Sequence, residues 1–413
     1  MRATKDSGFE WIGIIPAEWG LSKIGQVYRL RNTKVSDTDY PPLSVTNKGI
    51  VPQLDTAAKT NAHDDRKLVK KGDFAINSRS DRRGSCGISD YDGSVSLINT
   101  ILAPLNEMNP GYYDWLFHTV QFGDEFYKFG HGIVDDLWTT GWQEMKKITI
   151  PTPPLPEQKR IADFLDAKCA EIDALTDDIQ TQIDTLEQYK RSVITETVTK
   201  GLNPDVEMKD SGNQYWGKIP TNWYLSDIKY LFEIVKRIAG KEGYDILSVT
   251  QKGIKIKDIS NNEGQVAESY ANYQFVYPGD FVMNHMDLLT GWVDCSKLFG
   301  VTSPDYRVFK LRNKNNSLNY YKYIMQTCYM NRIFYSLGQG VSYLGRWRLQ
   351  TSSFNNFMVP VPPVEVQESI ANYLDKKCTE INACIDDKQR QLEILAEYKK
   401  TLIFEYVTGK KEV

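Results

Sequence analysis

Two stretches of this chain carry apolar side chains at every seventh position. In the first stretch these are Leu165, Ile172, Ile179, Leu186 and Val193, with a neighbouring stripe of Ile161, Leu175, Ile183 and Tyr189. In the second they are Leu374, Ile381, Leu395 and Leu402, and Lys388 interrupts the series. A seven-residue apolar repeat is typical of helices that pair in a coiled coil. Prolines stand just ahead of both stretches, where they favour a helix start. We therefore predict two long helices that pack on each other through these residues, the first ending at Gly201.

The two helices belong to a duplication that covers the chain. Residues 7–24 and 211–228 are identical at nine of 18 positions, and residues 161–178 and 370–387 at eleven of 18. A Gly-Asp-Phe triplet followed by Asn, and then a Gly-X-Gly triplet, recur between these blocks in the same order. Such self-similarity indicates a tandem repeat, here of about 205 residues.

Each repeat has two unlike parts. Segments 1–150 and 211–357 are rich in Gly, Tyr, Trp and Asn, with short β-branched runs between turn signals, which predicts small mixed α/β domains. Segments 151–210 and 358–413 are predicted to be helical spacers, the first with a linker. The fold class expected is therefore α+β, with two globular domains each followed by a long helix.

The repeat also indicates that the two long helices of this chain pair with each other. If both copies share one internal geometry, a pseudo-two-fold axis relates them and the helices form an antiparallel coiled coil. Cys169 and Cys378 would then lie at opposite ends, so we expect no disulfide between them. Trp19 and Trp223, at matching positions after Ile-Pro, are expected to pack in the core.

Composition narrows the classes of protein. With 41% hydrophobic and 25% charged residues, the chain is typical of a globular protein and not of a disordered one. The start of the chain does not resemble a signal peptide and no long apolar run is present, so we expect a cytoplasmic protein that does not bind membranes. Six scattered cysteines and four histidines indicate neither a metal site nor a disulfide framework.

Catalytic signatures are not found in the sequence. It contains no P-loop, GxSxG or HExxH motif and no Asn-Pro-Pro-aromatic motif of amino-methyltransferases. Pro204, Asp205, Glu207 and Lys209 have the letters of a nuclease metal site, but they are crowded into one linker. We therefore predict no catalytic residue.

Charge is distributed unevenly along the chain, whose net charge is -3. Residues 1–150, 151–210, 211–359 and 360–413 carry net charges of -1, -6, +6 and -2. The helical segments are therefore acidic and the second globular domain is basic. Separate partners for separate parts would suit this distribution.

Two pairs of equivalent loops are the candidates for binding DNA. The residues that flank the loops are alike in the two copies, but the residues at the loop tips differ, as expected of two domains that recognise different DNA sequences. Arg, Asn and Gln side chains are suited to binding base edges and phosphates. The alternative is solvated loops without a ligand. The residues singled out in the loops are Asn77, Ser78, Arg79, Arg82, Arg83, His131 and Trp138, and then Asn284, His285, Gln339, Ser342, Tyr343, Arg346 and Arg348. Lys48, Gln251 and Lys252, in the repeated Ser-Val-Thr-Asn/Gln-Lys-Gly-Ile turn, either contact DNA or are solvated.

This organisation resembles the specificity subunit of type I restriction-modification enzymes over essentially the whole chain. The residues that carry the resemblance are PTPPLPEQKRIADFLDAKCAEID and VPVPPVEVQESIANYLDKKCTEIN, together with the repeated triplets. The second copy departs from the family pattern, with Val364-Glu365-Val366-Gln367 in place of Leu-Pro-Glu-Gln. The resemblance implies a non-catalytic subunit that reads a bipartite, asymmetric site in double-stranded DNA and holds two methyltransferase and two restriction subunits.

Further expectations follow from the resemblance. S-adenosylmethionine, ATP and magnesium would be used by the partner subunits, so no cofactor is expected on this chain. Two other classes stay open at this point, a stand-alone sequence-specific DNA-binding regulator and a metal-dependent nuclease.

Overall fold

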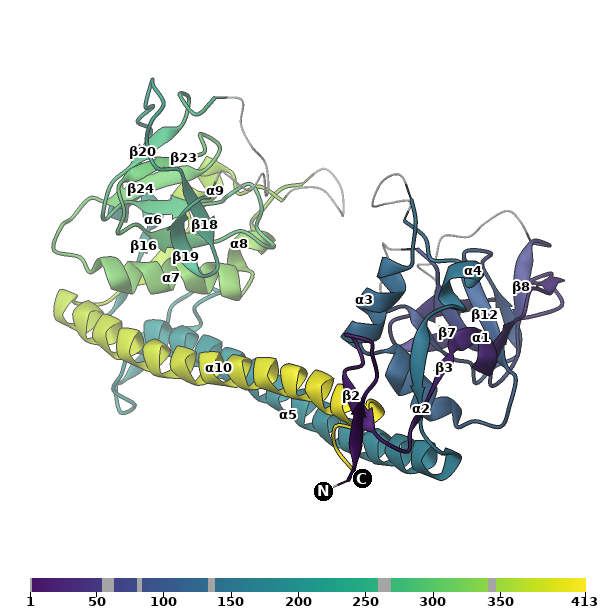
Figure 1. Cartoon of the computed structure of the whole chain (residues 1–413). Helices are drawn as coiled ribbons and strands as arrows, with labels where there is room; N and C mark the ends of the chain where they lie inside the picture. Colours follow the sequence, from purple (N-terminus) through teal and green to yellow (C-terminus); the bar gives the residue numbers. More distant parts are fainter. Residues whose placement is uncertain (1, 54–62, 80–83, 133–137, 259–268, 341–346) are drawn as a thin grey trace. The chain divides into compact units, whose positions relative to one another are not determined.

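The computed structural model describes residues 2–53, 63–79, 84–132, 138–258, 269–340 and 347–413. The chain forms two compact units (Figure 1). The first contains Met1–Gln180 and Gln389–Val413, and the second contains Thr181–Lys388. Residues 389–413, which the sequence assigns to the second spacer, thus pack with the first globular domain.

Both long helices contribute to both units. Helix α5 (Leu155–Lys200) follows the first globular domain, and α10 (Val364–Val407) follows the second. The remaining helices are short. In the first unit they are α1 (Ile24–Val27), α2 (Pro110–Phe117), α3 (Val120–Lys128) and α4 (Trp142–Met145), and in the second α6 (Ile228–Leu231), α7 (Leu318–Met330), α8 (Ile333–Ser336) and α9 (Thr351–Asn355).

The strands of the two units correspond one to one in most positions. The first unit has β1 (Thr4–Asp6), β2 (Ile14–Pro16), β3 (Gly20–Lys23), β4 (Tyr28–Leu30), β5 (Lys34–Val35), β6 (Leu43–Thr46), β7 (Gly49–Pro52), β8 (Arg66–Val69), β9 (Phe74–Asn77), β10 (Cys86–Ile88), β11 (Gly93–Val95), β12 (Asn99–Pro104) and β13 (Thr149–Thr152). The second has β14 (Met208–Asp210), β15 (Lys218–Pro220), β16 (Tyr224–Asp227), β17 (Phe232–Val235), β18 (Leu247–Thr250), β19 (Gly253–Ile256), β20 (Gln274–Val276), β21 (Phe281–Met283), β22 (Val293–Cys295), β23 (Gly300–Thr302), β24 (Arg307–Leu311) and β25 (Met358–Val361).

The sheets repeat the same topology. A four-stranded antiparallel sheet has the order β10-β9-β12-β4 in the first unit and β22-β21-β24-β17 in the second. Equivalent residues have equivalent partners, since Ile76 pairs with Thr100 and Met283 pairs with Arg307. Hairpins β6–β7 and β18–β19 also correspond. The duplication read from the sequence is therefore a duplication of fold.

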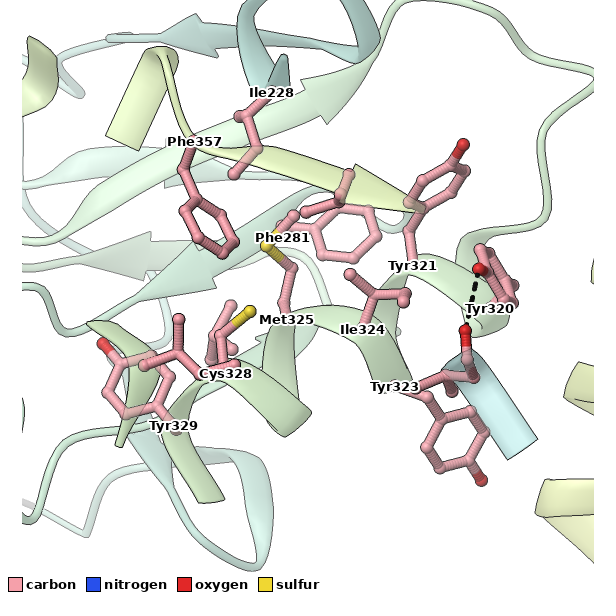
Figure 2. Close-up of a cluster of buried hydrophobic side chains, with 14 of the residues drawn as sticks. Ile228, Phe281, Tyr320, Tyr321, Tyr323, Ile324, Met325, Cys328, Tyr329 and Phe357 are labelled. Atoms are coloured by element: carbon pink, nitrogen blue, oxygen red, sulfur yellow. Dashed lines mark hydrogen bonds between the residues drawn. The ribbon is translucent and has the colours of Figure 1, made fainter. Parts of the chain in front are cut away.

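A helix covers each main sheet and supplies much of the core. In the second unit, Tyr321, Ile324 and Met325 of α7 lie next to Phe281 of the sheet, as Figure 2 shows. Burying each such side chain contributes about 1.5–3 kcal/mol. Trp19 and Trp223 are 1% and 2% exposed and lie in the cores of their units, as predicted.

One glutamine anchors the start of each long helix to the domain ahead of it. Gln158 accepts a bond from the backbone N–H of Asn109, which caps α2, and donates to the carbonyl of Pro153. Gln367 accepts from Ser317, which caps α7, and donates to Pro362. The second copy departs from Leu-Pro-Glu-Gln but keeps this glutamine, so its helix begins at the equivalent residue.

Segments of the two long helices run antiparallel within each unit. In the first unit, Lys399 forms an ion pair with Asp173 at 2.5 Å, and the rings of Phe164 and Tyr406 are 4.5 Å apart. In the second, Lys190 donates to the side chain of Asn382 at 2.7 Å. Position numbers rise along one helix as they fall along the other, which is the antiparallel sense.

Most residues of the seven-residue series are buried. Leu186, Val193 and Leu395 are half-buried, and the buried ones are Leu165, Ile172, Ile179, Leu374, Ile381 and Leu402. At the interruption, Lys388 donates to Gln182 and Ile385 is buried instead. In the neighbouring stripe, Ile161 and Ile183 are buried as predicted. Leu175 and Tyr189 are a correction, because these side chains are 47% and 48% exposed.

Three further sequence expectations concern the end of α5, the cysteines and membrane-spanning segments. Helix α5 ends at Lys200, and Gly201 follows with φ +81°, the left-handed conformation expected of a glycine that ends a helix. All six cysteines are free thiols. Across the described ranges, no helix is long and apolar enough to cross a membrane.

Candidate nucleic-acid interface

The first pair of candidate loops follows equivalent strands, β9 and β21. Asn77 and Asn284 stand where the strands end, and each side-chain oxygen accepts a bond from the backbone two residues on, at Arg79 and Met286. Asn77 is 5% exposed. We predicted both as DNA-binding residues in loops. The placement in a loop is a correction for Asn77, which is buried at the end of β9. In both copies the amide oxygen fixes the turn, and the predicted contact with DNA stays a prediction.

The second pair of loops is closed at its base by backbone pairing and by tryptophan. His131 pairs with Thr139 and Gln339 pairs with Arg348. A Cβ added at Gly130 would lie 2.3 Å from Trp138 Nε1, which explains this glycine of the Gly-X-Gly triplet. Trp138 donates from Nε1 to the carbonyl of Tyr127 at 2.9 Å. The indole thus supports the loop, and the predicted contact of Trp138 with DNA stays a prediction.

In each unit the two loops are joined to each other. The N–H of Thr140 donates to the carbonyl of Ser78, and in the second unit the N–H of Leu349 donates to the carbonyl of His285, both at 3.0 Å. Loops separated by more than fifty residues thus form one surface in each unit. We call these surfaces the first loop pair, with the described residues 77–79, 84, 130–132 and 138–140, and the second loop pair, with 284–291, 338–340 and 347–349.

The first loop pair exposes Arg79 and His131. Ser78 is buried, and its hydroxyl is bonded to that of Thr100 at 2.8 Å, so its predicted contact with DNA stays a prediction. Beneath this surface lies a cavity of about 240 Å³, lined among others by Phe122 and Tyr127 of α3. Arg82 and Arg83 lie outside the described residues.

The second loop pair has different chemistry at the same positions. His285 and Arg307 occupy the places of Ser78 and Thr100 in the repeat. Burial, followed by the charges of Arg307 and Arg348, lowers the pKa of His285 to about 3, so its ring is neutral at physiological pH. Burial lowers the pKa of Arg307 to about 10, and its guanidinium stays charged. Gln339 and Arg348 are exposed, while Ser342, Tyr343 and Arg346 lie outside the described residues.

The repeated turns present lysines in the same way in both units. The hydroxyl of Thr46 donates to the carbonyl of Gly49, and Thr250 does the same to Gly253, both at 2.9 Å. Each threonine oxygen also accepts from the backbone N–H of Lys48 or Lys252. Both lysines and Gln251 are exposed at the tips of these hairpins.

The aspartates of the Gly-Asp-Phe triplets have structural tasks. Asp73 forms an ion pair with Arg31, and Asp280 with Arg237, each at 2.5 Å. Each also accepts a backbone N–H three residues earlier, which fixes the turn into β9 or β21. Arg307 was missed in the sequence, because a single arginine at the start of a short strand gives no signal of its place beneath a loop.

Comparisons with known proteins show which proteins this chain is similar to. Residues 16–185 match the family described as the type I restriction modification DNA specificity domain. The chain is 26% identical over 286 residues to the specificity subunit named for the type I restriction enzyme MjaX of Methanocaldococcus jannaschii, covering 65% of this chain and 61% of that one. It is 25% identical over 348 residues to the MjaVIII specificity subunit of the same organism, covering 78% and 76%.

Solved structures share the fold. A chain from a study of assembly and conformational transition of the type I restriction-modification system superposes with a TM-score of 0.71 at 13% identity, covering 96% of this chain and 99% of that one. The HsdS subunit from Thermoanaerobacter tengcongensis gives a TM-score of 0.53 at 14% identity, covering 98% and 100%. In sequence, this chain is similar to specificity subunits of type I restriction enzymes.

Along this chain, the family match covers most of the first globular domain and part of α5. The second domain is tied to it by the internal repeat and by the identical strand order of the main sheets. No group of three or more His, Cys, Asp or Glu residues in the described ranges is arranged to hold a metal ion.

Proposed function

We propose that this chain is a type I specificity subunit that reads a bipartite, asymmetric sequence in double-stranded DNA, one half-site with each loop pair. One observation carries the proposal. In both units, two loops that differ between the copies are hydrogen-bonded into one surface, on frames that are otherwise the same. A common frame orients both surfaces alike, while the different side chains give different base preferences.

The proposed assembly follows the family. The chain is the non-catalytic component of a restriction-modification complex, and it holds two methyltransferase and two restriction subunits. S-adenosylmethionine, ATP and magnesium act in those partners, in the cytoplasm. The acidic character of the segments that contain α5 and α10 supports a role in holding protein partners while the basic second domain meets DNA.

The length of the paired helices sets the distance between the half-sites in this proposal. Because two half-sites read from one face of DNA lie about one helical turn apart, a rigid spacer between readers fixes the number of unread base pairs. Helix α5 has 46 residues and α10 has 44. Each globular domain is therefore joined to a long helix and needs no flexible linker in this proposal.

Two measurements test the proposal. The first is the methylome of a host that expresses this chain with its methyltransferase subunit, compared with a host lacking this chain. We expect one bipartite, asymmetric motif carrying methyladenine, present only with the chain. The second is a gel shift with and without the methyltransferase subunit, where strong binding is expected only in the complex. Tight specific binding by the chain alone would favour a stand-alone regulator.

A further inference from the structure

Arg307 is a buried positive charge without a negative partner in the described part of the chain. It lies at the start of β24 and is 4% exposed. Its guanidinium donates to the carbonyl of Leu349 at 3.1 Å and to the hydroxyl of Thr351 at 3.3 Å, and it lies 4.6 Å from the ring centre of Phe354. These neighbours fix the group but do not neutralise it. Buried charges are normally paired, so an external anion is the missing partner.

Two further groups of the second loop pair face the same charge. Arg348 precedes Leu349 and is exposed, and its charge acts on both Arg307 and His285. His285 is 7% exposed, and its Nδ1 atom has no hydrogen-bond partner in the described residues. No ion pair joins Arg307 or Arg348 to a carboxylate in the described ranges. The three side chains therefore form one cationic and polar cluster.

The first unit has no equivalent charge at this place. Ser78 and Thr100 occupy the positions of His285 and Arg307, and their hydroxyls satisfy each other at 2.8 Å. The frame of the fold thus does not require an arginine there. The cluster is a feature that the second domain has and the first lacks, in the domain that carries a net charge of +6.

We propose that Arg307, Arg348 and His285 form a binding site for a backbone phosphate of DNA in the second half-site. This inference rests on the proposed function and adds the kind of contact. Arg348 reaches the phosphate directly because it is exposed, while Arg307 is held behind it and supplies a fixed charge from a poorly solvated position, where electrostatic attraction is stronger. A phosphate contact positions the DNA and carries no base preference.

The test uses the full chain assembled with its methyltransferase subunit and measures DNA affinity against salt concentration. Arg348→Ala should reduce the slope of log affinity against log salt by about 0.9, the value for one phosphate, on target and non-target duplexes alike. Affinity for the target should fall about tenfold or more, as expected for a lost charged hydrogen bond. Arg348→Lys should keep the slope, because phosphate accepts a point charge.

Lys310→Ala is the matched control. Lys310 lies on the same strand as Arg307, is exposed and is paired with Glu233. The Lys310→Ala variant therefore loses one positive charge, as Arg348→Ala does, but leaves the proposed phosphate site intact. The salt slope should stay that of the parent chain. The methylated motif should be unchanged in all three variants.

Three results would overturn the phosphate site. The salt slope could stay unchanged in Arg348→Ala, or Arg348→Ala and Arg348→Lys could both change the second half of the methylated motif, which would make Arg348 a base reader. Alternatively, Arg348→Ala could weaken binding of the methyltransferase subunit in the absence of DNA, which would assign the cluster to a partner carboxylate. Failure of the proposed function is distinct from these, because the parent complex would then yield no motif.

Discussion

Tyr112 in α2 donates its hydroxyl hydrogen to the carbonyl oxygen of Val407, at the end of α10, over 2.8 Å inside the core of the first unit. Tyr320 in α7 makes the corresponding bond to Val198, near the end of α5, at 3.3 Å in the second unit (Figure 2). The last turn of the chain therefore completes the first domain as the last turn of α5 completes the second.

Removing the chain from Leu402 onward should unfold the first unit selectively. The truncation takes Leu402 and Val407 out of its core, and losing one such side chain costs about 2–5 kcal/mol. That is a large part of a typical stability of about 5–15 kcal/mol. Hydrogen exchange resolved by segment should show protection lost around Tyr112 and kept around Tyr320. Removing only Glu412 and Val413 is the control, and equal loss in both units would contradict this account.

Gly130→Ala should disturb recognition by the first loop pair. A Cβ there would meet the ring of Trp138 at 2.3 Å, so the base of the loop must shift. We expect methylation of the target to fall at least tenfold, with the second unit as protected from hydrogen exchange as before. Gly123→Ala is the matched control, because a Cβ at that position in α3 meets nothing within 4 Å. Parent-level methylation by the Gly130→Ala chain would show that the loop base is unimportant.

The stability of the second unit should depend on pH through His285. Its pKa is about 3 in the folded chain and near 6.5 when unfolded, so unfolding takes up a proton at pH values between these two. Stability is therefore lost as the pH falls from about 6.5 towards 3, by up to about 1.4 kcal/mol per pH unit. Denaturant unfolding at several pH values measures this. His285→Gln should flatten the dependence, whereas His63→Gln, at an exposed site in the first unit, should not. The same pH dependence in both variants would refute the assignment.

Lengthening both helices should change the spacer of the recognised sequence and leave its two halves alone. Seven residues inserted after Gln180 and seven after Lys388 keep the antiparallel pairing and the seven-residue repeat in step. They add about 10 Å, or about three base pairs of DNA. The methylome of the variant should therefore contain the same half-sites further apart. Altered half-sequences at the parental spacing would reject the idea that the helices act as a ruler.

The sequence was most informative where local rules act alone. Prolines followed by a seven-residue repeat predicted both long helices, and identical blocks in identical order predicted two domains of one fold. Even the interruption at Lys388 was visible in the sequence, although the burial of Ile385 in its place was found only in the structure. The antiparallel sense followed from symmetry and not from propensity.

The contacts that make the interface were beyond such rules. Nothing in the spacing of Ser78 and Thr140 indicates that their backbones are bonded, because that contact depends on how a whole sheet and two helices pack. Asn77 was predicted to contact DNA because asparagine suits base edges. In the structure its side-chain oxygen accepts a hydrogen bond from the backbone N–H of Arg79. Arg307 was overlooked because its partner loops are close in space and distant in sequence.

The most direct test of the central claim is the methylome of a host carrying Arg79→Ala beside one carrying the parent chain, each with the methyltransferase subunit. Arg79 is exposed on the first loop pair. We predict that the first half of the methylated motif is relaxed or changed while the second half and the spacer stay the same. Equal loss of methylation at every site, or a change in the second half, would contradict a separate reading of each half-site by its own loop pair.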